Sequence, residues 1–547
     1  MAMDQVQRRR RQCGPKRLNC LTIHRIRRVK CDEIRPSCQR CLNTGRKCDG
    51  YSSDILISTR NSPNTPDLIQ RISTHIPGNT EEKRGFHYFL KNTAAELSGY
   101  YDSSFWQNLI LAASAQEPSL RHAVIAIGAL HEDFSQTRLM LSSSSSDKHD
   151  TDFALKQYAK AMSALRRSLS SGKQEPLTAL MSCILFVCFD SLRGWAESAM
   201  VHLQSGLRIL RDMRKLSSEN HIIEDNIAPL FLRLSIQSII YVDTRSALDR
   251  RAFAGELMNV SSEEIIISEN FESLEEARNA INQAADGLFR IFYMWDGELP
   301  LGQQPHESLA LFDKYTTQLN LWNLTFERFM VSKGKSLTNR EVRGAALLKI
   351  HHTTAKIMAS VRPAMNDMRP MADVVNLAER FMEYVDDFQI IINLSRSMMA
   401  AAEEDAKNGK PPLTFSSDLG LIGPLYYTCV KCTVPSIRTA AMELVLRCPR
   451  REGMWNSILV AKMIEEYWEI EARHKEAQEA GENLDEFGFP VPLRETLDLI
   501  FKDGMKWEWN WKNFQRRSNS KSQSLFWTDI LQDQSIFQDF PRMFEDN

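Results

Sequence analysis

The sequence lacks a hydrophobic run long enough to cross a bilayer. Its most apolar stretch, LTALMSCILFVCF at residues 177–189, has thirteen residues, whereas a membrane-spanning helix needs about 20. The N-terminal residues also lack the apolar core of a secretory signal peptide. We therefore expect a protein with no membrane partner.

Cysteine is scarce over most of the chain and concentrated near the N-terminus. Six of the eleven cysteines fall within the first 50 residues, namely Cys13, Cys20, Cys31, Cys38, Cys41 and Cys48. The other five are scattered, which does not match the dense framework of a small disulfide-bonded secreted protein. We expect a reducing intracellular compartment.

Net charge is nearly absent overall, at −1 for 547 residues of ordinary composition (43 % hydrophobic, 25 % charged). The first 50 residues, however, hold fourteen Lys/Arg and four Asp/Glu, a charge of +10, which leaves −11 on the remainder. A basic head on an acidic body indicates nucleic-acid binding. The run RRRR at residues 8–11 fits either a nuclear localisation signal or a basic arm that contacts phosphates.

Four of the N-terminal cysteines have the spacing of a zinc site. They form Cys31-x6-Cys38-x2-Cys41-x6-Cys48, and a C-x2-C turn directs two thiolates at one ion. The basic run RIRRVKC ends at the first of them, and CDGY begins at the last. Residues 20–51 resemble the DNA-binding module of the fungal zinc binuclear-cluster (Zn(2)-C6 fungal-type) transcription factors.

The resemblance implies two zinc ions held by six ligands. In the family the first and fourth cysteines bridge both ions, the second and third complete one site, and the fifth and sixth complete the other. Cys38 is then expected to bridge the ions, Cys31 to serve the first zinc, and Cys41 and Cys48 to serve the second.

The first half of the motif departs from the family's spacing. Counting back from Cys31 places the second ligand at His24 and the first at Leu21, so Cys20 lies one residue out of register. The expected ligands, on the interpretation that the cluster is complete, are Cys20, His24, Cys31, Cys38, Cys41 and Cys48.

Three interpretations of this departure are open. Cys20 and His24 can complete the cluster, because zinc accepts imidazole and tolerates such spacing. Alternatively the first site is lost, with Cys13 as a substitute thiolate. In the third interpretation Ile23-His24 replaces a single cysteine through a misassigned exon junction, since CLTCRIRRVKC would restore the family's spacing.

The resemblance also implies recognition of double-stranded DNA, with CGG-type triplets as the sites. In the family a short helix enters the major groove, where guanine O6 and N7 suit a long cationic donor. Arg28 is the expected base reader with Arg27 beside it, and Arg25 and Lys30 are expected to contact phosphates. A solvated basic helix without base specificity is the alternative.

The rest of the chain predicts a small zinc-cluster DNA-binding module followed by a large all-α domain. Residues 1–19 form the basic arm, and residues 52–85 have the Ser, Thr, Asn and Pro content of a linker. No heptads follow the cluster, so the oligomeric state is not predicted. Apolar residues at helical spacing predict the all-α domain over residues 86–515.

Several helices are expected within this domain. Asp102 or Ser103 is expected to cap one helix, and Pro118 to begin another. Residues 374–392 and 456–474 are each expected to be helical. Segments at 96–132, 183–210 and 422–455 resemble the helical fungal-specific regulatory region that follows the cluster in many of these factors, several of which control secondary-metabolite gene clusters.

Motifs for catalysis are weak or missing in the body. Cys429 and Cys432 form CVKC without further ligands nearby, and are expected to be buried in a helix. SKGKS at residues 332–336 has Phe329 where a phosphate loop needs its first glycine. His351 and His352 are adjacent, hence on different helix faces. We expect a regulator and no enzyme.

The C-terminal segment mixes acidic and aromatic residues. Residues 525–547 hold five Asp/Glu and one Arg among five Phe/Trp, a composition typical of disordered activation segments. We expect the tail at 516–547 to contact transcription machinery or a co-activator, or else to dock on the body as a helix. The chain is interpreted as a nuclear RNA polymerase II regulator with two zinc ions; the rival is a helical co-regulator with a defective cluster.

Overall fold

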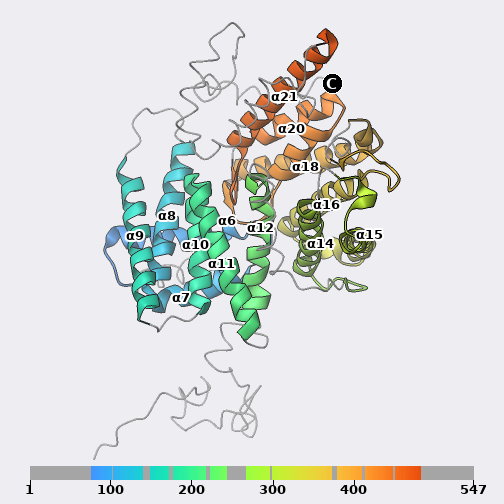
Figure 1. The fold of residues 1–547 in the computed structure, drawn as a ribbon. Coiled ribbons are helices and arrows are strands. Elements are labelled where there is room, and N and C mark those ends of the chain that lie inside the picture. Colours follow the sequence, from blue (N-terminus) through green and yellow to red (C-terminus); the bar gives the residue numbers. More distant parts are fainter. Residues whose placement is uncertain are drawn as a thin grey trace, which may run out of the picture. The chain divides into compact units, whose positions relative to one another are not determined.

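The computed structural model divides the chain into two units, Met1–Ile72 and Ser73–Asn547. The residues that it describes all belong to the second unit (Figure 1). They are 76–101, 103–139, 148–171, 176–216, 222–242, 267–295, 299–371, 378–409, 413–447 and 450–481. The expected zinc module, most of the linker and the C-terminal tail lie outside them.

The first half of the described unit is a set of packed helices. Its short elements are α5 (Thr80–Tyr88), the π-helical turns η1 (Phe89–Thr93), η2 (Phe105–Leu109) and η3 (Ile223–Ile227), α6 (Ala94–Leu97) and α7 (Ile110–Gln116). Its long helices are α8 (Pro118–Leu139), α9 (Lys148–Ser170), α10 (Pro176–Arg193), α11 (Ala196–Leu216) and α12 (Ala228–Val242). Helix α8 packs against both α9 and α10, and α10 packs against α11.

Local capping explains where these helices begin. Pro118 opens α8, as the sequence predicted, because its fixed φ and missing N–H suit a first helical turn. Ser103 Oγ accepts a 3.5 Å hydrogen bond from the Trp106 N–H, which agrees with the predicted cap. Helix α5 starts earlier than expected, inside the segment assigned to the linker. There Asn79 and Glu82 form a reciprocal capping box, which ends the linker before Thr80.

The second half is also helical. Its elements are α14 (Leu274–Met294), η4 (Leu301–Gln303), α15 (His306–Lys333), η5 (Gly334–Ser336), α16 (Asn339–Ser360), η6 (Ala378–Tyr384), α18 (Val385–Lys407), α19 (Ile422–Lys431), α20 (Pro435–Arg447) and α21 (Ser457–Ala480). Helix α21 begins after Asn456, whose side chain caps it, close to the predicted start. The single helix expected over 374–392 is wrong, because a 3-10 helix ends at Tyr384 before α18 begins.

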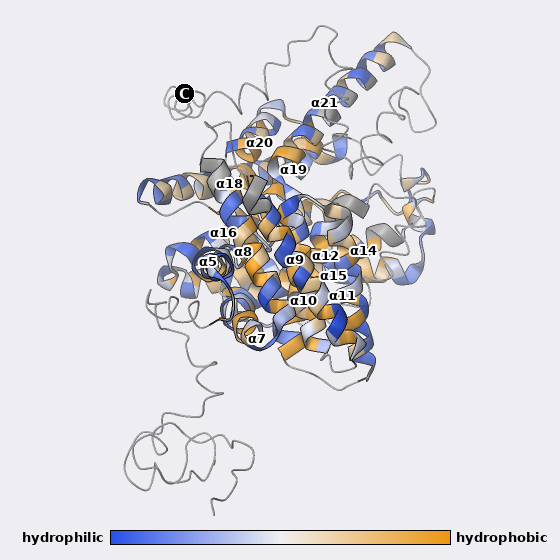
Figure 2. Cartoon of the chain, turned by 90° about the vertical axis from the view of Figure 1, so that its left-hand side faces the viewer, coloured by the Kyte–Doolittle hydropathy of each residue, from blue (hydrophilic) through white to orange (hydrophobic). Residues whose placement is uncertain are grey.

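Helix α10 is a long apolar helix that lies in the core (Figure 2). Its length and composition would allow it to cross a membrane, but 83 % of it is buried inside the protein. Every residue from 178 to 192 is buried. The all-round apolar character of α10 is therefore explained by neighbours on all sides.

A small three-stranded sheet was not predicted. Strand β1 (Phe415–Ser416) pairs in parallel with β2 (Arg451–Glu452), which pairs antiparallel with β3 (Trp455–Asn456). Gly453 takes φ +55° in the tight turn between β2 and β3, a conformation that glycine adopts at little cost. Strands of two residues carry no readable alternation, so no sequence pattern could reveal them.

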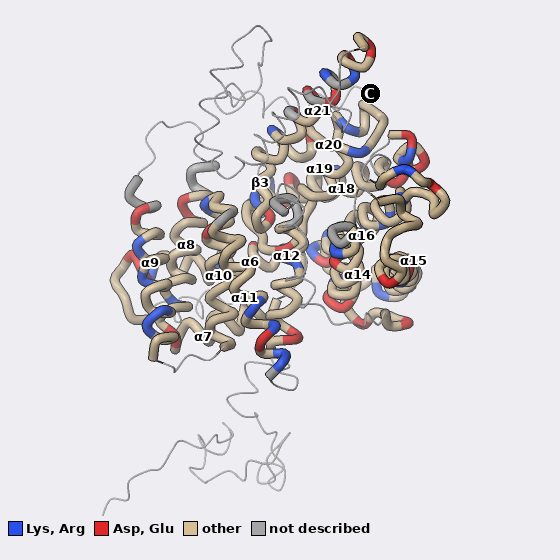
Figure 3. The backbone as a smooth tube through the Cα atoms, viewed as in Figure 1, with Lys and Arg blue, Asp and Glu red and all other residues tan. Residues whose placement is uncertain are grey.

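Two hydrophobic cores hold the second half together. One surrounds the fully buried Trp322, which stacks with Phe326 and His352 at centroid distances of 4.5 and 5.2 Å. The Trp322 indole N–H donates a 2.7 Å hydrogen bond to the Ala277 carbonyl, so its polar atom is satisfied. The other core joins α16 to the helices from α18 to α21. Charged side chains are spread over the helices, with basic stretches on α9 and at the end of α11 (Figure 3).

Candidate functional site

The residues predicted to bind zinc and to contact DNA lie outside the described residues. These are Cys20, His24, Cys31, Cys38, Cys41 and Cys48 for zinc, and Arg25, Arg27, Arg28 and Lys30 for DNA. The donor set itself fits zinc, because thiolate and imidazole are the ligands that zinc prefers in tetrahedral structural sites. The acidic-aromatic tail and the basic run at residues 8–11 likewise lie outside the residues that the structure describes.

The cysteines of the described body have a different character. Cys183, Cys188, Cys429 and Cys432 are buried and unpaired. Burial raises the pKa of the Cys183 thiol to about 12, and raises the thiol pKa of the other three. Thiols held protonated in apolar surroundings are inert. Within the described ranges no group of His, Cys, Asp or Glu could hold a metal ion, so CVKC is a packing element.

The described body contains a buried ion cluster of Arg233, Arg278 and Asp418, which we call the charged junction. Asp418 Oδ2 accepts a 2.7 Å hydrogen bond from Arg278 Nη1, and Asp418 Oδ1 lies 3.1 Å from Arg233 Nε. The Arg278 guanidinium also lies 4.4 Å above the Tyr101 ring. Three distant segments, α12, α14 and the loop after β1, thus meet around one carboxylate.

The pKa values of the charged junction follow from burial and mutual charge. Burial opposes ionisation of Asp418, but the charges of Arg278 and Arg233 hold the pKa of its carboxyl below the usual range. Burial, together with repulsion from Arg278, lowers the pKa of Arg233 to about 10. Arg233 and Asp418 are therefore both charged at neutral pH, in a water-poor environment.

A second buried carboxylate, Glu452, lies next to the charged junction. Its two oxygens accept hydrogen bonds from the backbone N–H groups of Leu421 and Ile422 at 3.0 and 2.8 Å, at the start of α19. Arg450 Nε donates to the same carboxylate at 2.6 Å. A helix N-terminus favours a negative group, so Glu452 ties the β2 strand to α19.

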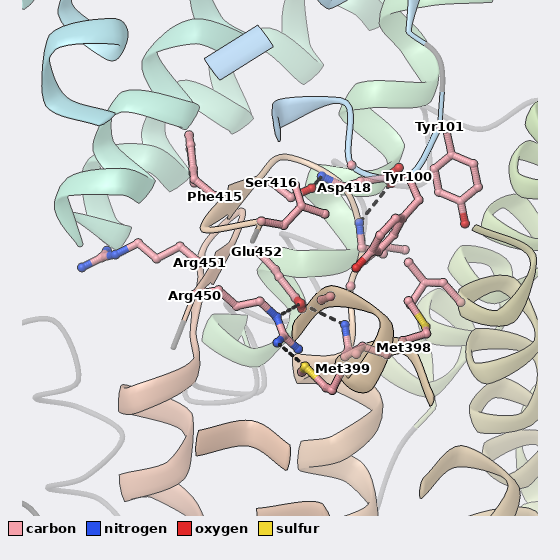
Figure 4. A pocket seen from close by; sticks show the side chains of 17 residues that line it. Tyr100, Tyr101, Met398, Met399, Phe415, Ser416, Asp418, Arg450, Arg451 and Glu452 are labelled. Atoms are coloured by element: carbon pink, nitrogen blue, oxygen red, sulfur yellow. Dashed lines mark hydrogen bonds and ion pairs between the residues drawn. The ribbon is translucent and has the colours of Figure 1, made fainter. Parts of the chain in front are cut away.

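A cavity of about 40 Å³ lies beside these groups (Figure 4). Its lining includes the apolar side chains of Tyr100, Met398, Met399 and Phe415 and the ion pair of Arg450 and Glu452. The volume has room for a few water molecules and is far below the roughly 300–1,000 Å³ of small-molecule sites. This cavity therefore does not serve as an effector pocket.

Further polar contacts join the first half of the body to the sheet region. Glu96 Oε2 accepts hydrogen bonds from the Thr414 backbone N–H at 2.7 Å and from its hydroxyl at 2.9 Å. His131 lies between Thr93 and Thr414, with ring nitrogens 2.9 and 3.0 Å from the two hydroxyls. The Gln237 amide donates to the Ser417 carbonyl at 3.1 Å. These contacts give the region a structural role.

One more buried acid lies in the helical bundle. Asp190 on α10 accepts a 3.1 Å hydrogen bond from the Tyr158 hydroxyl, and His202 Nε2 lies 3.6 Å from the same oxygen. Burial raises the pKa of Asp190 to about 6, against the lowering effect of its hydrogen-bond partners. Burial lowers the pKa of His202. Sequence inspection missed this cluster because its members come from three helices.

The other motifs behave as predicted. SKGKS occupies the end of α15 and the turn η5, and Phe329 is buried. His351 Nε2 lies 2.9 Å from the Gly420 carbonyl, whereas His352 Nε2 lies 3.1 Å from the Leu319 carbonyl. The two rings contact different parts of the fold and share no ligand. In the described residues, these motifs thus pack in the core or link separate segments by hydrogen bonds.

Comparison with known families identifies both parts of the chain. Residues 24–55 match the family described as fungal Zn(2)-Cys(6) binuclear cluster domain, which binds two zinc ions. Residues 84–248 match the fungal specific transcription factor domain. The first match begins at His24, so it includes Cys31, Cys38, Cys41 and Cys48 but not Cys20.

Three curated relatives are similar to the chain. The aspercryptin biosynthesis cluster-specific transcription regulator of Emericella nidulans is 24 % identical, over 90 % of this chain and 93 % of the relative. A transcription regulator of Purpureocillium lilacinum is 29 % identical over 38 % of this chain and 52 % of the relative. An uncharacterized transcriptional regulatory protein of Schizosaccharomyces pombe is 26 % identical over 20 % of this chain and 23 % of its own length. No solved structure matches.

A zinc-cluster module followed by a large helical body defines a class of DNA-binding regulators. The chain thus contains a match to the fungal zinc-cluster domain followed by a helical body that matches the fungal specific transcription factor domain in part, and the predicted fold class is confirmed in both parts. Transcription factors of this family are in general not enzymes, in agreement with the expectation from the motifs.

Proposed function

We propose that this regulator is nuclear, that it reads CGG-type triplets in double-stranded DNA, and that it controls RNA polymerase II transcription of a secondary-metabolite gene cluster. The observation that carries the proposal is the zinc-cluster match over residues 24–55, which includes the basic run RIRRVK at residues 25–30. The relative that aligns along nearly the whole chain is named for a biosynthetic cluster, which supports the pathway class.

The proposed DNA contacts divide into two kinds. Arg28, with Arg27 beside it, reads guanine O6 and N7, because a long bidentate cation matches those two acceptors. Arg25, Lys30 and the basic run at residues 8–11 contact phosphates, which adds affinity without sequence information. Cys20, His24 and the four later cysteines are the proposed zinc ligands, and zinc binding supplies most of the folding energy of so small a module.

The proposed organisation follows the sequence with one revised boundary. The basic arm occupies 1–19, the zinc module 20–51 and the tail 516–547. The linker runs from 52 to 79, since α5 starts at Thr80, and the helical regulatory domain follows it. We propose that the tail contacts transcription machinery or a co-activator.

One observation favours a second candidate. The family match starts at His24 and leaves out Cys20, and the family's first ligand position holds Leu21. A chain that loses its first zinc site would act as a helical co-regulator without direct DNA binding.

A gel shift with the full chain separates the two candidates. We expect a shift on duplexes with CGG triplets, none on scrambled duplexes, and loss of the shift on zinc chelation with recovery on added zinc. Cys38→Ser should abolish binding, whereas Cys432→Ala, which alters a buried thiol of the body, should leave it intact. Absence of any CGG-dependent shift from folded, zinc-supplemented protein would favour the co-regulator.

A further inference from the structure

The outer face of α9 is unusually basic for a body that is acidic overall. Residues 153–171 contain four Lys/Arg and no Asp/Glu. At 100° per residue, Lys156, Lys160 and Arg167 fall along one edge of the solvent-exposed half of α9. Met162 and Leu169 fall along the opposite edge. All five are exposed; together with Arg166 between the edges they define what we call the α9 face.

Most of these positive charges are not neutralised by an ion pair within the described residues. Lys160 Nζ pairs with Glu82 at 2.8 Å, and Arg167 Nε donates to the Ser163 carbonyl at 3.4 Å. Among the described residues, Lys156 and Arg166 have no ion pair. Cations in the last turn of a helix are favoured by its dipole, which accounts for Arg167. The dipole does not account for Lys156, which lies about three turns earlier.

The apolar edge of the α9 face is also unexplained by folding. Met162 is 38 % exposed and Leu169 is 53 % exposed. Figure 3 shows basic residues gathered on α9 and at the corresponding end of α11. A surface with a basic edge and an apolar edge suits a partner that is both acidic and apolar. A phosphate backbone would use the charges and leave the apolar edge without a role.

This chain contains a segment with that chemistry. Residues 525–547 carry five acidic residues, one arginine, and the aromatic residues Phe526, Trp527, Phe537, Phe540 and Phe544. The connecting residues 482–524 can span more than about 100 Å when extended, at roughly 3.3 Å per residue. Their length therefore permits contact with any face of the body.

We propose that the α9 face binds residues 525–547 of the same chain. The carboxylates of the segment pair with Lys156, Arg166 and Arg167, and its aromatic side chains cover Met162 and Leu169. The segment that would contact a co-activator is then withheld until a competing partner displaces it. This regulation extends the proposed function and rests on it only for its consequence in transcription.

Hydrogen–deuterium exchange of the full chain tests the docking directly. We expect Lys156→Glu with Arg167→Glu to make peptides from 525–547 exchange at least about tenfold faster. The matched control, Lys335→Glu with Lys407→Glu, reverses two exposed lysines on η5 and α18, and should leave that exchange unchanged. Exchange of α10 must stay slow in both variants, which shows that the body remains folded.

A charge swap keeps the test decisive if the first variant is perturbed. Adding Asp533→Arg and Asp539→Arg to the Lys156→Glu, Arg167→Glu chain should restore slow exchange in the tail. Equal tail exchange in the wild type and the α9 variant overturns the proposal. If tail exchange is unchanged while the α9 variant loses DNA affinity, the face belongs to DNA and the proposal is wrong.

Dilution separates docking within one chain from association of two. Tail exchange that is independent of protein concentration supports the proposal, and exchange that accelerates on dilution overturns it in favour of a second copy. A gel shift on CGG duplexes is measured in parallel with the α9 variants. If the wild-type chain shows a CGG-dependent shift but no difference in tail exchange from the α9 variant, the docking proposal has failed; if the tail docks but no CGG-dependent shift appears, the proposed function has failed.

Discussion

Arg278 Nη1 donates a 2.7 Å hydrogen bond to Asp418 Oδ2, across 140 residues of sequence. Both side chains are buried, and Arg233 approaches the same carboxylate from α12. Asp418 thus lies against two arginines at the point where three segments meet. We expect the stability of the helical body to depend on this buried carboxylate more than on an exposed ion pair.

Replacing Asp418 should reveal that dependence. We expect Asp418→Asn to lower the free energy of unfolding by about 3–5 kcal/mol, because it removes the buried counter-charge that Arg233 and Arg278 share and leaves Arg278 only the largely exposed Glu275, 3.6 Å away. Asp313→Asn, which removes the exposed partner of Arg362, is the control and should cost about 0–1 kcal/mol. Urea denaturation measures both, and similar losses in the two variants would contradict the role given to Asp418.

The same variant should show a defined pH dependence. The pKa of Asp418 is held below its usual range, so its stabilisation is complete above about pH 4, the unfolded value. It is lost as the pH falls through the lower folded pKa. The stability gap between wild type and Asp418→Asn should therefore narrow only in strong acid. A gap that narrows on raising the pH would have the wrong sign.

Asp190 should behave in the opposite way. Its pKa is raised from 3.8 to about 6, so between these values the unfolded chain is ionised while the folded chain stays protonated. Stability from this group is full below about pH 4 and is lost as the pH rises through 6, by up to about 3 kcal/mol. Asp190→Asn should gain stability relative to wild type over pH 4–6.5. Melting-temperature profiles of wild type and Asp190→Asn that run parallel across this pH range would count against this.

The turn between β2 and β3 should tolerate only glycine. A Cβ added at Gly453 would overlap the Gln237 side-chain amide, and φ is +55°. We expect Gly453→Ala to cost about 2–4 kcal/mol from backbone strain and overpacking together. Gly409 has φ +80° with nothing within 4 Å, so Gly409→Ala should cost only about 1–2 kcal/mol for the backbone. Equal costs in thermal unfolding would show that crowding at Gly453 is unimportant.

The base reader and the basic arm should be separable by measurement. Arg28→Ala is expected to cost about 1–3 kcal/mol on CGG duplexes and to relax preference at one guanine. Alanine at residues 8–11 should instead weaken binding evenly across sequences and flatten the salt dependence. Equal losses of affinity and specificity in both variants would mean that the two kinds of contact are not distinct.

Local signals in the sequence predicted the helices well where caps are present. Pro118 and Asn456 stand at or next to the starts of α8 and α21. The Asn79–Glu82 capping box was equally readable, and the Ser, Thr and Pro content around it hid the start of α5. The break before α18 has no comparable signal, because the apolar spacing continues through Tyr384.

The charged junction could not have been predicted from the sequence. Arg233, Arg278 and Asp418 each look like surface residues in their own segments. Only the tertiary fold brings them together, and no local period encodes a contact across 140 residues. The zinc cluster is the reverse case, since its ligands are close in sequence and their spacing alone carries the chemistry.

The contacts from α12 to the loop after β1 also determine how late in synthesis this part of the body can complete its folding. Gln237 donates to the Ser417 carbonyl across 180 residues, and Arg233 finds its carboxylate in the same loop. At about 5–20 residues per second, the ribosome needs on the order of 10–40 s to deliver that loop after α12 has emerged. During this interval the apolar α12 lacks its neighbour α14, and Arg233 on α12 lacks the Asp418 carboxylate. A fragment ending near residue 248 would remain in that state permanently, and chaperones should bind it.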